Sequence, residues 1–184
     1  RQLLGDDCIW SGSELHGYEL GPPVPSRARV RLGLPQAYAE HSWHADRPGP
    51  RELGYHRLKI MVYCAPTAAE NGAFRVVPGS HRLEFHQRLA PLQRAHYIKG
   101  SRKEEHLISA DPEWASNTFG TVGVDLPAYV CEAHPGDVLY FHHSLFHAAY
   151  YHYVGRIFFA LKFAQRPTCD AHHASNWRLS PNLY

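Results

Sequence analysis

The sequence lacks the features that mark membrane, nucleic-acid-binding and disulfide-rich proteins. No apolar run approaches the roughly 20 residues that span a bilayer, and the net charge is only +2 with 20% charged residues. The four cysteines form no Cys-X-X-Cys pair, and scattered single cysteines are typical of reduced thiols in an intracellular protein. We therefore expect a cytoplasmic protein that binds neither nucleic acid nor a membrane. Its oligomeric state stays open.

A length of 184 residues fits one domain with its own core. We find no internal repeat or low-complexity tract, so residues 1–184 are interpreted as a single domain. No signal peptide is visible, but the chain begins with Arg1 rather than Met. We therefore expect the N-terminus to be truncated.

The residue pattern favours short strands. Fourteen prolines and fourteen glycines are more typical of strands and turns than of a helical bundle. Alternating apolar residues predict strands over 58–63, 73–77, 128–133 and 156–163. On the first strand, Lys59, Met61 and Tyr63 share the face that we expect to point inward. Residues 82–127 predict an irregular insert with a weak helical rhythm that Pro91 breaks, so the fold class is mainly β, a sandwich or barrel.

The stretch EHSWHADRPG, residues 40–49, places His44 and Asp46 two positions apart. Alternate residues of a strand point to the same side about 6.5 Å apart, so both side chains can reach one ion. Imidazole nitrogen with carboxylate oxygen suits a divalent metal such as Fe(II). The pair alone is weak, because a chain with 15 histidines contains His-X-Asp triplets by chance. The reversed pair Asp170 and His172, in the polar C-terminal tail, is interpreted as such a chance match.

A metal site needs a third ligand, and the segment GDVLYFHHSLFHAAYYHYVGR offers four histidines, namely His142, His143, His147 and His152. The segment ends at Arg156. An arginine on the inner face of a barrel is costly unless a carboxylate meets it, and its planar fork suits a small dicarboxylate. Two histidines, a carboxylate and a nearby arginine are typical of the facial-triad iron oxygenases. The choice among the four histidines stays open on these grounds.

Four motifs give the chain a resemblance to a known family. They are WHAD at 43–46, ENGAFRVVPGSHR at 70–82, GDVLYFHHSLFH at 136–147, and an arginine several residues later. In this order they resemble the phytanoyl-CoA dioxygenase family of Fe(II)/2-oxoglutarate oxygenases. The resemblance spans about residues 43–163. It implies a double-stranded β-helix, a jelly-roll or cupin-like barrel, with a few flanking helices.

The resemblance also implies which residues bind the metal. The family pattern places the distal ligand on His147, so His44, Asp46 and His147 are the expected ligands of Fe(II). His142 matches a family histidine near the site, which is better interpreted as a supporting residue than as a ligand. We expect His143 and His152 to be surface or lid residues.

Arg156 matches the family arginine that grips the distal carboxylate of 2-oxoglutarate. The family often places a hydroxyl residue two positions after the distal histidine, and here that position is Ala149. One polar contact to the co-substrate is therefore missing or supplied from elsewhere. Lys59 and Tyr63 are candidates to supply it, because both lie on the inward face of their strand.

The implied activity is oxidation of a C–H bond, in most cases hydroxylation, at the expense of dioxygen and 2-oxoglutarate, which leaves as succinate and CO2. Halogenases built on this scaffold lack the carboxylate ligand, so the presence of Asp46 favours hydroxylation. The substrate is expected to be a small molecule. Arg47 and Arg51 could meet an anionic substrate, although solvated loop charges are the simpler interpretation. Two alternatives are a cupin-like metalloenzyme that does not use 2-oxoglutarate and a non-catalytic ligand-binding barrel.

Overall fold

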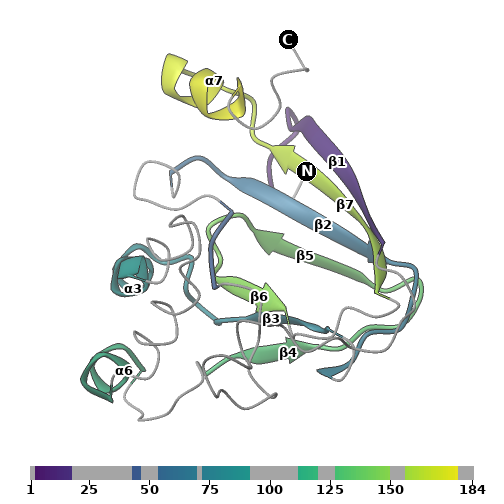
Figure 1. The fold of residues 1–184 in the computed structure, drawn as a ribbon. Helices are drawn as coiled ribbons and strands as arrows, with labels where there is room; N and C mark the ends of the chain where they lie inside the picture. The colour runs from purple at the N-terminus through teal and green to yellow at the C-terminus, as the bar shows by residue number, and fades with distance from the viewer. Residues whose placement is uncertain are drawn as a thin grey trace.

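The computed structural model describes residues 3–17, 43–46, 54–69, 72–91, 112–119, 127–149 and 156–177. Within these ranges the chain forms two antiparallel sheets (Figure 1). The larger sheet has the strand order β1-β7-β2-β5, and its strands are β1 (Ile9–Gly17), β7 (Ile157–Ala164), β2 (Arg57–Tyr63) and β5 (Val138–His142). The smaller sheet has the order β4-β3-β6, formed by β4 (Tyr129–Cys131), β3 (Phe74–Val76) and β6 (His147–Ala149).

The core lies between the inner faces of the two sheets. Met61 and Tyr63 of β2 and Phe158 of β7 pack there with Phe74 of β3 and Phe141 of β5. Strand β7 shows the reason in its sequence, because alternate side chains of a strand face opposite sides. Its inward residues are buried, whereas the neighbouring Phe159 is 47% exposed. The apolar alternation therefore gives one sheet face to the core.

Three helices lie among the described residues: α3 (Leu83–Arg88), α6 (Pro112–Phe119) and α7 (Asp170–Trp177). Helices α3 and α6 belong to the segment 82–127 that the sequence predicted to be irregular, so part of this insert is helical. A second core cluster joins this region to the sheets, where Phe85 and Trp114 pack against Leu89 and Phe146. None of the helices within the described ranges has the length and apolar character needed to cross a membrane.

The mainly β prediction is confirmed. The four predicted strands correspond to β2, β3, β4 and β7, with ends that differ by one or two residues. The inward face predicted for β2 is also correct, since Met61 and Tyr63 are fully buried and Lys59 is largely buried. Strand β1 was not predicted, although it forms the edge of the larger sheet beside β7.

Candidate metal centre and cavity

His44 and His147 are held opposite each other by their own backbones. The His44 N–H donates to the His147 carbonyl at 3.1 Å, and the His147 N–H donates to the His44 carbonyl at 2.8 Å. This exchange of two hydrogen bonds forms an isolated antiparallel bridge and directs both side chains to the same face. The imidazole ring centroids are 4.4 Å apart. Two histidines separated by 103 positions are therefore brought together by main-chain geometry.

Asp46 completes a cluster of three possible ligands. One of its oxygens, Oδ1, lies 3.7 Å from Nε2 of His44 and 3.8 Å from Nε2 of His147. Ligand atoms of the three residues all lie within 4.8 Å of one another, and within the described part of the chain this is the one group of three or more potential metal ligands that meets this criterion. Two imidazoles and a carboxylate are a donor set for a divalent transition metal. The residues present therefore fit an iron site.

The residues between the ligands explain why this short segment is well placed. Trp43 is 3% exposed and Ala45 is 1% exposed, and both belong to the core cluster beneath Phe146. Because residues alternate in an extended segment, burial of Trp43 and Ala45 turns His44 and Asp46 toward the opposite side. The guanidinium of Arg75 stacks over the Trp43 ring at 4.8 Å. Trp43 is thus a core residue that orients the two ligands.

His147 has the protonation state that a metal ligand requires. Its Nδ1–H donates to the Leu145 carbonyl at 2.9 Å, which leaves the Nε2 lone pair directed at the cluster. Burial, with a further contribution from His44, lowers the pKa of His147 to about 3, against the opposing effect of Asp46. The imidazole is therefore neutral at physiological pH.

Asp46 uses its second oxygen to hold Lys59. The Lys59 ammonium donates to Oδ2 of Asp46 at 3.2 Å, and both side chains are largely buried. Burial raises the pKa of Asp46, but His147 and Lys59 oppose it and leave that pKa well below its usual range. The carboxylate is therefore ionised, with Oδ1 facing the two imidazoles and Oδ2 facing a cation.

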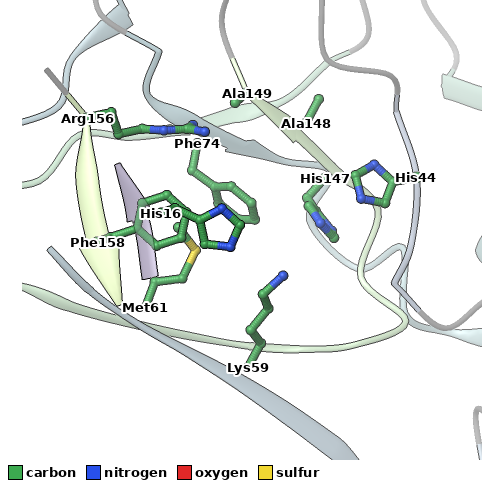
Figure 2. A pocket seen from close by; sticks show the side chains of 10 residues that line it. All are labelled: His16, His44, Lys59, Met61, Phe74, His147, Ala148, Ala149, Arg156 and Phe158. Atoms are coloured by element: carbon green, nitrogen blue, oxygen red, sulfur yellow. The ribbon is translucent and has the colours of Figure 1, made fainter. Parts of the chain in front are cut away.

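A cavity of about 170 Å³ extends from this cluster to Arg156. Figure 2 shows His44 and His147 on one side, Arg156 on the other, and Lys59 pointing into the space between them. The remaining lining residues come from both sheets and are His16, Met61, Phe74, Ala148, Ala149 and Phe158. The cavity thus joins a candidate metal centre to a buried cation through apolar walls.

Arg156 is anchored at the far end. It is 3% exposed, its Nη1 donates to the Gly72 carbonyl at 2.7 Å, and its guanidinium lies 5.2 Å from the Phe158 ring centroid. Tyr63 does not line the cavity among the described residues, but its buried hydroxyl has no hydrogen-bond partner there. Burial raises the pKa of Tyr63 while the nearby Arg156 charge opposes the rise, which places the hydroxyl in the electrostatic field of the guanidinium.

The two adjacent histidines of the HHS segment lie on opposite faces of β5, and the expectation that His143 is a surface residue is wrong. His143 is 1% exposed, and its electrostatic influence lowers the pKa of Asp46. His142 does not line the cavity; its Nε2 lies 3.4 Å from Nδ1 of His56. Phe141 packs inward, so strand alternation turns His142 outward and His143 inward. His152, Arg47 and Arg51 lie outside the described residues.

Two further polar groups beside the cavity were not found from the sequence. His16 of β1 stacks on Phe158 with ring centroids 4.7 Å apart, and its Nε2 lies 2.9 Å from Oε2 of Glu14. The other oxygen of Glu14 pairs with Lys162 of β7. No motif marks these residues, because they meet only through the pairing of β1 with β7.

Buried histidines predict a loss of stability in acid. Burial, with the neighbouring His56, lowers the pKa of His142 to about 4, and His147 titrates near 3. In the unfolded chain both histidines take up protons below about pH 6.5, whereas the folded protein does not. The free energy of unfolding of the metal-free protein should therefore fall as the pH drops from about 6.5 toward 4, by up to about 1.4 kcal/mol per pH unit for each histidine. Urea unfolding at pH 7, 6 and 5 measures this slope, and a flat profile would contradict it.

The fold and the site define a two-sheet β protein with a candidate facial triad, and comparison with known families agrees. The family model for phytanoyl-CoA dioxygenase (PhyH) matches residues 33–152. The chain belongs to the phytanoyl-CoA dioxygenase family. No curated protein matches the sequence.

Solved structures support the fold. EctD from S. alaskensis in its apoform is 18% identical, with 89% of this chain and 47% of that chain covered and a TM-score of 0.51. AviO1 from Streptomyces viridochromogenes Tue57 is 19% identical, with 88% and 52% covered and a TM-score of 0.48. HygX from Streptomyces hygroscopicus with nickel and 2-oxoglutarate bound is 19% identical, with 60% and 37% covered and a TM-score of 0.36. The chain thus spans about half or less of these structures, and the jelly-roll prediction is confirmed.

Proposed function

We propose that the protein is an Fe(II)- and 2-oxoglutarate-dependent dioxygenase that hydroxylates a C–H bond of a small-molecule substrate. The observation that carries the proposal is the joining, by one cavity, of the triad His44, Asp46 and His147 to the buried guanidinium of Arg156. A facial triad leaves metal positions open for a co-substrate and dioxygen. The bound iron supplies the redox chemistry that couples decarboxylation of 2-oxoglutarate to oxidation of the substrate.

The protein's own residues have distinct tasks in this proposal. His44, Asp46 and His147 hold the metal, and Lys59 fixes the outer oxygen of Asp46. Because Lys59 occupies that oxygen, Asp46 offers one oxygen to the metal, which keeps the remaining positions open. An ionised aspartate at this position favours hydroxylation over halogenation.

Arg156 holds the distal carboxylate of 2-oxoglutarate through its planar fork. Ala149 offers no hydroxyl beside it, and the buried Tyr63 hydroxyl is the group that we propose supplies the second contact. Met61, Phe74 and Phe158 exclude water from the space between the metal and the arginine. All four cysteines are free, and we propose a cytoplasmic location on that basis.

An anaerobic titration of the metal-free protein with Fe(II) and then 2-oxoglutarate tests the proposal. The expected result is a weak visible charge-transfer band of the iron–2-oxoglutarate chelate. Iron binding without the band would favour a cupin-like metalloenzyme that does not use 2-oxoglutarate. Absence of iron binding would leave a ligand-binding barrel, and succinate formation under air then serves as a second readout.

A further inference from the structure

Two lysines face each other directly across neighbouring strands beside the candidate metal centre. Lys59 of β2 is the register partner of Lys162 of β7, so both side chains project from the same inner face with Cβ atoms about 5 Å apart. The two side chains are only 14% and 17% exposed. Like charges in such a pair destabilise a sheet unless anions compensate them.

Each lysine meets one carboxylate in the described structure. Lys59 donates to Asp46, and Lys162 donates to Glu14, whose other oxygen is engaged by His16. An ammonium group has three N–H donors, so two remain on each lysine. Four donors on adjacent strands are therefore available to one further acceptor.

The charge around the cavity stays positive after loading. Two carboxylates stand against three cations among the described ionisable side chains in and beside it, the set being Asp46, Glu14, Lys59, Lys162 and Arg156. An Fe(II) ion and a 2-oxoglutarate dianion cancel each other. The loaded site therefore keeps an excess of one positive charge, and the metal draws on the Asp46 charge that otherwise neutralises Lys59.

The lysine pair is separate from the end of the cavity assigned to 2-oxoglutarate. Lys162 lies six residues beyond Arg156 along the chain, which is about 20 Å in an extended strand. Lys59 lies between them, next to Asp46. A group bound by the lysines therefore lies near the metal but away from Arg156, where a second molecule can be presented for oxidation.

We propose that the oxidised substrate carries an anionic oxygen group, a carboxylate or phosphate, and that Lys59 and Lys162 bind it. This inference rests on the proposed function and names the substrate class of the same site. Glu14 acts as a positioning residue, because it holds the Lys162 ammonium and the His16 ring in place. The other possible source of the anion is the chelating end of 2-oxoglutarate itself.

The test uses methylphosphonate and acetate as probes of the anionic group. Each is added to protein loaded anaerobically with Fe(II) and 2-oxoglutarate, and paramagnetic broadening of the probe's 31P or methyl 1H line is compared with Zn(II)-loaded protein. The visible chelate band is recorded on the same samples. Lys162→Met is expected to weaken probe binding about tenfold, as for the loss of one charge-assisted hydrogen bond. Arg166→Gln, which removes an exposed cation, is the matched control and is expected to change nothing.

The outcomes separate the inference from the function on which it rests. Broadening that Lys162→Met reduces, with the band intact, supports the anion site. An intact band without broadening, or broadening that Lys162→Met leaves unchanged, overturns it and leaves the oxygenase proposal standing. A probe that bleaches the band shows that the lysines hold 2-oxoglutarate, which also overturns it. An absent band overturns both. Because Lys162→Met leaves Glu14 without its cation, the double variant Glu14→Gln/Lys162→Met removes the pair as a unit and must show the same loss.

Discussion

Replacing His147 by alanine is expected to abolish iron binding at micromolar metal. His147 supplies one of three ligand nitrogens and oxygens, and its Nε2 is directed at the cluster by the hydrogen bond from Nδ1–H to Leu145. Loss of a supporting residue around a metal costs 10–100-fold in affinity, so loss of a ligand should cost more than about 100-fold. Isothermal titration with Fe(II) under anaerobic conditions, or with Ni(II) as an air-stable probe, measures the change.

His142→Ala is the matched control, because the sequence offered both histidines as candidates. His142 contacts His56 on the outer side of β5 and does not line the cavity, so its loss should leave metal affinity within a few-fold. The backbone bridge between His44 and His147 does not depend on a side chain, so His147→Ala should stay folded by circular dichroism. A folded His147→Ala protein that binds iron normally would remove His147 from the site.

Strand alternation made much of the site predictable. His44 and Asp46 were found because ligands two residues apart share a face, and the structure shows the intervening Ala45 buried on the other face. The same pattern correctly turned Lys59 inward. Periodicity acts locally, so it determines these orientations before any tertiary contact is known. The choice of His147 came from the family resemblance, and the backbone bridge to His44 is its physical reason.

Other parts of the site depend on pairings that a single sequence does not reveal. The roles of His142 and His143 were exchanged because the family pattern was given more weight than the inward position of Phe141, from which alternation turns His143 toward Asp46. His16 and Lys162 acquire their positions only when β1 and β2 pair with β7. Long-range register is set by the whole buried face and by turn geometry, so it could not be predicted from either strand alone.

Replacing Arg156 by glutamine is expected to raise the dissociation constant of 2-oxoglutarate about 100-fold while leaving iron binding nearly unchanged. Arg156 is buried at the end of the cavity opposite the triad. Truncating one partner of a buried, hydrogen-bonded charge pair costs about 2–5 kcal/mol, and every 1.4 kcal/mol is tenfold in affinity. Titration of the Fe(II)-loaded protein with 2-oxoglutarate, followed by the chelate band, measures the constant.

Two companion variants separate charge from geometry at this end of the cavity. Arg156→Lys keeps the charge but loses the planar fork that binds a carboxylate with two parallel hydrogen bonds, so an intermediate loss is expected. Tyr63→Phe removes only the buried hydroxyl beside the guanidinium, and a neutral hydrogen bond predicts a loss of up to about tenfold. Equal affinity for 2-oxoglutarate in Arg156→Gln and the unmodified protein would mean that the distal carboxylate binds elsewhere. The lysine pair Lys59 and Lys162 would then be the cationic group to test as its partner, because it is the other half-buried cluster of positive charge beside the metal centre in the part of the chain that the structure describes.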